Sequence, residues 1–223
     1  KDEDEERKWK RGKHFNGHWA GFELGVNGLA NEDYSLYGAT DYADLEFMEL
    51  NQIKSIEVNL NFLEYSIVLD DKYTGLVTGM GFSMNNYRFD NDLTVIRDED
   101  GMLVPVSLDG QKAEKSKLTA SYLTIPLLLE FQIPVNGRSN RLFISGGIVG
   151  GLNLGSHTKV KYDDSKEKDR GSFNINPFKC SATVRAGLKD ISLYACYAFT
   201  PLFRNDKGPE LFPFSIGISL INF

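Results

Sequence analysis

Histidine and cysteine are scarce in this chain, with three histidines and two cysteines among 223 residues. His14 and His18 precede the first strand-like pattern, His157 falls in a polar stretch, and no serine nucleophile motif surrounds any of them. A catalytic triad requires a nucleophile, a base and an orienting carboxylate at hydrogen-bonding distance. We therefore predict that the protein is not an enzyme and has no cofactor. A lipid-acting enzyme is the weakest alternative, and it would need His157 and loop carboxylates to meet in one cleft.

Metal-ligand spacings are missing as well. His14 and His18 would form a metal-binding pair only on a helix, and this part of the chain is dominated by charged residues. The acidic runs Asp98-Glu99-Asp100 and Asp163-Asp164 lack the spacing of a calcium-binding loop. The sequence therefore predicts solvated surface at these positions and no metal site.

Long hydrophobic runs and an excess of basic residues are also absent. No stretch approaches the roughly 20 apolar residues of a transmembrane helix. The net charge is −6, and no basic cluster is interleaved with aromatic residues, which argues against a nucleic-acid partner. The search for long hydrophobic runs does not detect a membrane-spanning β-barrel, because half of the residues in each of its strands are polar.

What the sequence does contain is alternation of apolar and polar residues, most regularly between Phe178 and Phe203. Period two is the period of a β-strand, and Lys189-Asp190 interrupts it as a two-residue hairpin turn. This turn predicts a register that aligns the two apolar faces. The predicted pairs are Leu188 with Ile191, Ala186 with Leu193, Val184 with Ala195, and Arg185 with Tyr194.

The same register places the two cysteines on opposite faces of the hairpin. Cys180 shares the apolar face with Phe199, whereas Cys196 lies on the polar face beside Thr183. A disulfide between opposite faces would distort both strands. We therefore predict two free thiols.

Six further segments alternate in the same way, so the predicted number of strands is eight. The second of them changes the parity of its apolar residues near Phe62-Leu63, which indicates a β-bulge. The connections alternate between long and short, and the long segment from 90 to 117 is expected to contain a small hairpin around Met102 to Leu108. The predicted strands are 19–30, 56–69, 76–84, 122–134, 142–154, 178–188, 191–199 and 211–223.

The two faces of these strands differ in a way that selects a membrane barrel. Glu23, Glu57, Glu130 and Arg185 lie on the face that is rich in glycine and serine, as a crowded interior requires. Leucine, isoleucine, phenylalanine and valine occupy the other face, whereas a soluble lipocalin-like barrel would turn them inward. We therefore predict an all-β fold: an eight-stranded, antiparallel, up-and-down transmembrane β-barrel with its long loops outside the cell.

A barrel of eight strands is just wide enough for side chains to fill it. The charged residues of the lumen are then expected to stabilise the interior, because an unpaired buried charge is costly. We expect Arg185 to pair with Glu130, Glu57 or Glu23, in a structural network rather than a catalytic or proton-relay site.

The N-terminal residues form a separate unit in this interpretation. Residues 1–18 are predicted to be a charged, solvated periplasmic arm, in which Trp9 is the one candidate for a membrane-interface anchor. Residues 19–223 are predicted to be the barrel domain.

Two segments resemble a known family. Tyr122-Leu123-Thr124-Ile125-Pro126-Leu127-Leu128-Leu129-Glu130-Phe131 is similar to the YLxIPLLLxF strand of the PorT-like outer-membrane β-barrels, best known from Bacteroidota, and Trp19 to Gly25 resembles the first strand of that family. The resemblance runs from about Trp19 to Phe223, and the terminal Phe223 resembles the aromatic signal that outer-membrane assembly machinery reads.

This resemblance implies an integral protein of the bacterial outer membrane, surrounded by outer-membrane lipids that include lipopolysaccharide. It further implies a membrane anchor or a subunit of a larger secretion, assembly or transport complex. The alternatives are a ligand- or lipid-binding barrel and a narrow pore.

Overall fold

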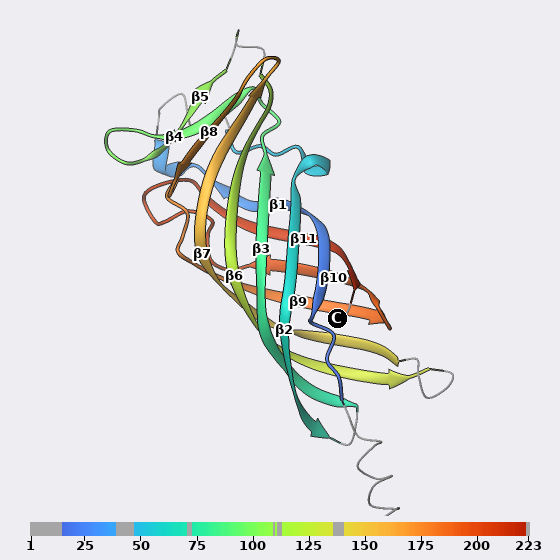
Figure 1. Cartoon of the computed structure of the whole chain (residues 1–223). Coiled ribbons are helices and arrows are strands. Elements are labelled where there is room, and N and C mark those ends of the chain that lie inside the picture. Colours follow the sequence, from blue (N-terminus) through green and yellow to red (C-terminus); the bar gives the residue numbers. More distant parts are fainter. Residues whose placement is uncertain are drawn as a thin grey trace, which may run out of the picture.

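The structure, a computed structural model, describes residues 15–38, 47–70, 73–108, 110, 113–135 and 141–221. It is built almost entirely of antiparallel strands that run around a common axis (Figure 1). Among the described residues, no helix is long and apolar enough to cross a membrane. The strands are β1 (Gly21–Asp33), β2 (Ile56–Asp70), β3 (Thr74–Arg88), β4 (Leu93–Arg97), β5 (Leu103–Ser107), β6 (Ala113–Pro134), β7 (Arg141–Tyr162), β8 (Lys166–Gly171), β9 (Phe178–Leu188), β10 (Ile191–Ala198) and β11 (Glu210–Ile221). Two short 3-10 helices, η1 (Ser35–Tyr37) and η2 (Gln52–Lys54), lie between β1 and β2.

Eight of the described strands close into a barrel. The order is β6-β3-β2-β1-β11-β10-β9-β7, and β7 pairs back to β6. β8 pairs with the outer part of β7, and β4 pairs with β5 in a separate two-stranded sheet. The predicted class, an eight-stranded antiparallel up-and-down barrel, is confirmed.

The predicted register of the β9–β10 hairpin is also confirmed. Leu188 pairs with Ile191, Val184 with Ala195, and Arg185 with Tyr194 across the Lys189-Asp190 turn. Cys180 and Cys196 are both free thiols, as the register predicted. The pairing of β2 with β3 shifts between Asn61 and Leu63, which is the predicted bulge.

Three features at the outer end of the barrel differ from the expectation. β6 begins at Ala113 instead of Tyr122, β7 extends to Tyr162 instead of Leu154, and β8 lies in a segment that was expected to be a loop. The reason is that the polarity of the faces inverts above the membrane, where Leu118 and Ala120 of β6 are buried inside and lysines point outward. A search for apolar residues on the outward face therefore loses these strands.

The small hairpin also differs in its bounds. The expected segment, Met102 to Leu108, supplies only the second strand, β5, whereas the first strand is β4 at Leu93–Arg97. The turn between them includes Gly101, whose φ of 76° is a left-handed conformation that suits glycine.

The barrel wall is apolar outside and polar inside. Val184, Leu193 and Ile216 are 63%, 62% and 58% exposed on the outer surface, whereas Glu23 and Glu130 are fully buried in the lumen. In membrane barrels, an outward apolar band of this kind lies within the hydrocarbon region of the bilayer. Its residues therefore face hydrocarbon in the membrane.

The two ends of the barrel are built differently (Figure 1). The short connections β2–β3, β6–β7 and β9–β10 lie at the end where β1 begins and β11 finishes, which is the periplasmic end in this class of barrel. The long connections and the β4, β5 and β8 strands gather at the opposite, outer end.

At the outer end, described residues of the long connections pack with the ends of β1, β3, β6 and β11 in one hydrophobic cluster. We call this cluster the outer cap. Tyr37 anchors η1 to the β4–β5 hairpin, because its hydroxyl donates a 2.5 Å hydrogen bond to the Leu103 carbonyl. Burial, followed by the nearby Asp98 carboxylate, raises the pKa of Tyr37. The buried members of the outer cap include Leu29, Tyr34, Tyr37, Phe47, Met48, Leu50, Tyr87, Phe89, Leu93, Val95, Leu103, Leu118, Phe173, Ile175, Leu202, Phe203 and Leu211.

Candidate functional site

The middle of the lumen contains a buried ion pair. Alternation turns Arg185 of β9 and Glu23 of β1 inward, and barrel closure brings them together although 162 residues separate them in sequence. Both guanidinium Nη atoms donate to the Glu23 carboxylate, the Nη2–Oε2 contact at 3.2 Å. Asn59 Nδ2 of β2 donates to the same Oε2 at 3.0 Å. The paired charges therefore satisfy most of each other's hydrogen-bonding groups in the buried interior of the lumen.

Two aromatic rings flank this ion pair. The Arg185 guanidinium carbon lies 4.5 Å from the centre of the Trp19 ring and 5.5 Å from that of Tyr194. The Tyr194 hydroxyl in turn donates a 2.9 Å hydrogen bond to Glu57. Three of the four predicted lumen residues, Glu23, Glu57 and Arg185, thus belong to one cluster, in which Arg185 pairs with Glu23 and Glu57 bonds through Tyr194.

A small cavity adjoins this cluster. Its volume is about 40 Å³, room for two to three waters by the usual measure. Asn59, Asn61, Ser181 and Arg185 line it, and each has a buried polar atom without a protein partner in the described part of the chain. A space of this size and polarity suits water and is too small for an organic ligand.

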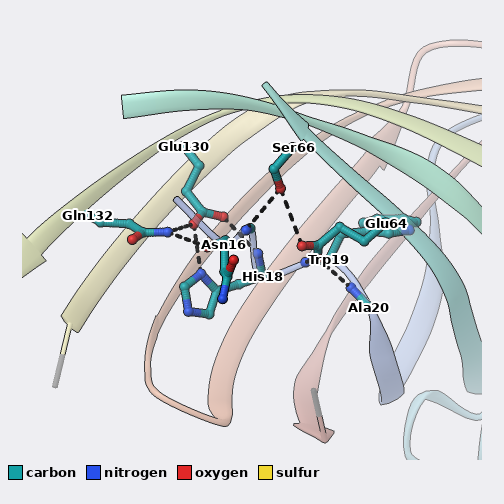
Figure 2. A network of polar contacts seen from close by, with 9 residues as sticks. Asn16, His18, Trp19, Ala20, Glu64, Ser66, Glu130 and Gln132 are labelled. Carbon is teal, nitrogen blue, oxygen red and sulfur yellow. Dashed lines mark hydrogen bonds and ion pairs between the residues drawn. The ribbon is translucent and has the colours of Figure 1, made fainter. Parts of the chain in front are cut away.

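On the periplasmic side of this cavity, the residues that precede β1 lie inside the lumen, and Figure 2 shows their polar contacts with the barrel wall. We call Phe15–Ala20 the N-terminal segment. The Glu64 carboxylate accepts hydrogen bonds from the backbone N–H groups of Trp19, at 2.7 Å, and Ala20, at 3.0 Å. One inward carboxylate of β2 therefore satisfies two backbone donors of the segment.

The fourth predicted lumen residue, Glu130 of β6, holds the same segment (Figure 2). His18 donates its backbone N–H to Glu130 Oε2 at 3.2 Å, and its Nδ1 lies 2.7 Å from Oε1. Gln132 Nε2 donates to the Asn16 carbonyl at 2.6 Å and to Glu130 Oε1 at 2.7 Å. Ser66 accepts the Gly17 N–H at 3.0 Å. Glu130 therefore binds the N-terminal segment and does not contact Arg185. We call the residues that hold the segment, Glu64, Ser66, Glu130 and Gln132, its seat.

Apolar packing completes this seat. Phe15 and Trp19 are 5% and 3% exposed and pack with Val77 and Leu128. The His18 ring stacks on Phe143 with centroids 3.9 Å apart. Glycine at position 75 is required for this fit, because a Cβ there would lie 2.5 Å from the Phe15 ring. The wall of the lumen is therefore shaped to the segment.

This placement corrects the expectation of a solvated arm for residues 15–18 only, since residues 1–14 of the predicted arm lie outside the described residues. Phe15–His18 lie inside the lumen, because Phe15 has an apolar pocket there and the backbone N–H groups find carboxylates. Trp9 and His14 lie outside the described residues, as does Phe223, the predicted assembly signal. The proposed boundary between arm and barrel stays a prediction.

The sequence reasoning missed Glu64, Tyr194, Trp19 and His18 as lumen residues. A signal for Glu64 was available, because the bulge near Phe62-Leu63 changes the parity of β2, so that positions 64 and 66 face inward after it. Tyr194 was placed opposite Arg185 but was not assigned a role. Trp19 has the parity of Glu23 in the predicted strand 19–30, so alternation was a signal for its inward position, whereas nothing local in the sequence indicates that His18 turns into the lumen.

Two of the three histidines, His18 and His157, lie in the described part of the chain. The His18 ring contacts the Glu130 carboxylate and the Phe143 ring, and among the described residues no hydroxyl or thiol hydrogen-bonds to it. His157 is paired in the sheet with Thr119 and Arg170. Burial and then the charges of Lys168, Lys117, Arg170 and Lys159 lower the pKa of His157. No group of three or more histidine, cysteine, aspartate or glutamate side chains in the described ranges is arranged to hold a metal ion.

A closed ring of eight antiparallel strands, apolar outside and charged inside, defines a transmembrane β-barrel. The family model described as the outer membrane protein β-barrel domain matches residues 19–204, most of the chain. The protein therefore belongs to the outer membrane protein β-barrel family and resides in the bacterial outer membrane. A search of the curated proteins returns no match to the chain.

Proposed function

We propose that the protein is a closed, non-enzymatic barrel that serves as a membrane anchor or as a subunit of a larger outer-membrane complex. The observation that carries the proposal is the filled lumen. The N-terminal segment occupies its periplasmic part, the Arg185–Glu23 cluster its middle and the outer cap its far end, and the cavity between them is about 40 Å³.

The filled lumen argues against a pore. An ion crossing the barrel would have to displace the N-terminal segment from Glu64 and Glu130 and open the outer cap. Both are held by several hydrogen bonds and buried aromatic side chains, which makes transient opening costly.

The ends of the barrel support a role in contacting other molecules. The outer cap presents a surface outside the cell that is supported by a hydrophobic core. The YLTIPLLLEF strand, which forms the centre of β6, resembles PorT-like barrels, and that resemblance favours a secretion, assembly or transport complex. We propose this narrower, PorT-like role on the strength of the resemblance.

Single-channel recording in planar bilayers tests whether the barrel is closed. We expect the purified full chain to give no conductance steps. The matched variant combines Glu64→Ala and Glu130→Ala, which release the N-terminal segment, and is expected to give rare openings. Stable conductance by the unmodified protein would replace the anchor with the narrow-pore alternative.

Gentle detergent extraction from native membranes, affinity purification and mass spectrometry test the association. A large partner in stoichiometric amount supports the complex subunit, and a bare barrel supports the stand-alone anchor.

Incubation of the pure protein with phospholipid and lipopolysaccharide vesicles tests the absence of enzymatic activity. Fatty-acid or sugar release that disappears in His157→Ala or His18→Ala would contradict the proposal.

One observation favours a second candidate, a ligand-binding barrel. A groove of about 540 Å³ lies at the outer end, between the β10–β11 connection and the end of β1, within the size range of small-molecule sites. Leu36, Phe199, Arg204 and Phe212 are among its lining residues. Native mass spectrometry of the gently extracted protein tests this candidate, which predicts a bound small molecule that Arg204→Ala loses.

A further inference from the structure

The outer ends of four neighbouring strands carry a concentration of positive charge that the net charge of −6 conceals. The strands are β3, β6, β7 and β8, which lie side by side (Figure 1). We call this set of side chains the cationic belt. Its members are Arg88, Lys115, Lys117, Lys159, Lys161, Lys166, Lys168 and Arg170, with His157 among them.

Strand pairing places these residues in rows. One row runs from Arg88 through Lys117 and Lys159 to Lys168. Another joins Lys115, Lys161 and Lys166, and a third sets His157 beside Arg170. Directly paired residues have Cβ atoms about 4.5–5.5 Å apart, so like charges face each other across every pair of strands.

The belt lies on the outward face of the sheet. Ser116 and Leu118 of β6 and Thr158 and Val160 of β7 are buried on the opposite, inward face. The same outward face of β6 continues toward the membrane through Leu123, Ile125 and Leu127 of the apolar band. The positive charges therefore sit directly above the lipid-facing wall, on the outer side of the membrane.

Acidic groups balance little of this charge. Lys161 pairs with Glu114 at the upper edge of the belt, where Asp163 and Asp164 follow β7. Glu167 and Asp169 alternate onto the other face of β8. Arg88 donates to the Glu114 carbonyl at 2.8 Å and Lys117 to the Asn86 amide oxygen, so both heads are held in place by neutral acceptors.

Burial and then the neighbouring positive charges lower the pKa of two lysines of the belt. Burial, followed by the charges of Lys115, Lys159 and Lys168, lowers the pKa of Lys117 to about 8. Burial and then Arg88, Lys159 and Lys161 lower the pKa of Lys115. A bound anion would relieve this repulsion, because it favours the charged form of each lysine.

We propose that the cationic belt binds the phosphate groups of lipopolysaccharide molecules that pack against the β6–β7 wall. The chemistry required is a row of cations just above an apolar surface, which matches a phosphorylated sugar head carried on acyl chains. The position on the side wall, and not on the outer cap, selects a lipid of the outer leaflet over a soluble anion.

The test is native mass spectrometry of the full chain in detergent with bisphosphorylated lipid A and with the same lipid after phosphate removal. We expect the phosphorylated lipid to bind at least about tenfold more tightly. The triple variant Lys117→Gln, Lys159→Gln and Lys168→Gln should lose this preference, and the matching triple change to arginine should keep it. Millimolar inorganic phosphate should not displace the lipid.

The matched control removes three cations elsewhere on the outer side, with Lys54→Gln, Arg97→Gln and Lys207→Gln, and should bind lipid A normally. Gel heat-shift verifies that each barrel is folded. If the first triple variant does not fold, Lys115→Gln, Lys161→Gln and Arg170→Gln probe the other rows. Equal binding of the two lipids, undiminished preference in a folded belt variant, or displacement by inorganic phosphate would overturn the proposal.

Discussion

At the scale of single residues, the lumen depends on buried charges that are paired with each other. Arg185 is 4% exposed and Glu23 is fully buried, so each depends on the other for compensation. The rings of Trp19 and Tyr194 pack on the Arg185 guanidinium, and Asn59 donates a hydrogen bond to the Glu23 carboxylate. Removal of one partner leaves a bare charge, which costs far more than the pair itself contributes.

The first prediction is that Arg185→Leu lowers the free energy of unfolding by about 3–5 kcal/mol, because Glu23 is left buried without its partner. Urea titration in detergent, with gel heat-shift to monitor folding, measures the loss. The double change Glu23→Gln with Arg185→Leu should recover a large part of it. An unchanged unfolding midpoint in Arg185→Leu would refute the structural network.

The second prediction concerns the outer face, where Val184 is 63% exposed toward lipid. Val184→Arg should destabilise the barrel by about 2–4 kcal/mol if the side chain lies near mid-bilayer. Ile191→Arg, beside the periplasmic turn, is the depth control and should cost only about 0–1 kcal/mol. Reversible unfolding from lipid vesicles gives both values. Full tolerance of arginine at Val184 would contradict the lipid-facing assignment.

At the scale of elements, the N-terminal segment is the least regular part of the lumen and the most specifically held. The backbone N–H groups of Trp19 and Ala20 do not pair with a neighbouring strand. Both donate hydrogen bonds to the Glu64 carboxylate instead. Glu130 does the same for His18. Two inward carboxylates therefore stabilise an irregular segment inside a β-barrel, since unpaired buried donors are costly.

The third prediction tests this seat through Trp19, one of two tryptophans in the chain. In a Trp9→Phe background, Glu64→Ala with Glu130→Ala should shift Trp19 emission to the red and raise its quenching by iodide, because the segment leaves the lumen. Glu167→Ala, an exposed carboxylate of β8, is the control and should change neither. Unchanged emission in the double variant would show that packing of Phe15 and Trp19 holds the segment without the carboxylates.

At the scale of the whole molecule, the barrel and the outer cap have separate cores. The barrel closes by backbone pairing around a polar lumen, whereas the cap buries aromatic and aliphatic side chains of the long connections against the outer ends of β1, β3, β6 and β11. The β4–β5 hairpin contributes Val95 and Leu103, both fully buried, to the cap and no strand to the barrel. Damage to the cap should therefore leave the barrel intact.

The fourth prediction follows from this separation. Val95→Asp should make the outer loops more sensitive to trypsin on intact cells, because a charge replaces a fully buried side chain of the cap. The gel heat-shift of the barrel should be unchanged. Val106→Asp, on the same hairpin but 37% exposed, is the matched control and should leave the loops as resistant as before. Loss of barrel folding in Val95→Asp would mean that the two cores are not independent.

The sequence alone was sufficient for the features that depend on neighbours along the chain. Alternation is local, so it determined the eight strands in the membrane, the register across Lys189-Asp190 and the bulge in β2. It also separated the two faces, because lipid outside and a crowded lumen inside impose opposite compositions. The family match over residues 19–204 agrees with this class of fold.

Only the tertiary structure decided which distant residues meet. Glu23, Glu57 and Glu130 were equivalent partners for Arg185 until closure of the barrel placed Glu23 beside it and left Glu130 to hold His18. The cationic belt likewise assembles from strands between Arg88 and Arg170. Contacts of this kind depend on strand order, tilt and closure, and these follow from the packing of the whole barrel, which no local period encodes.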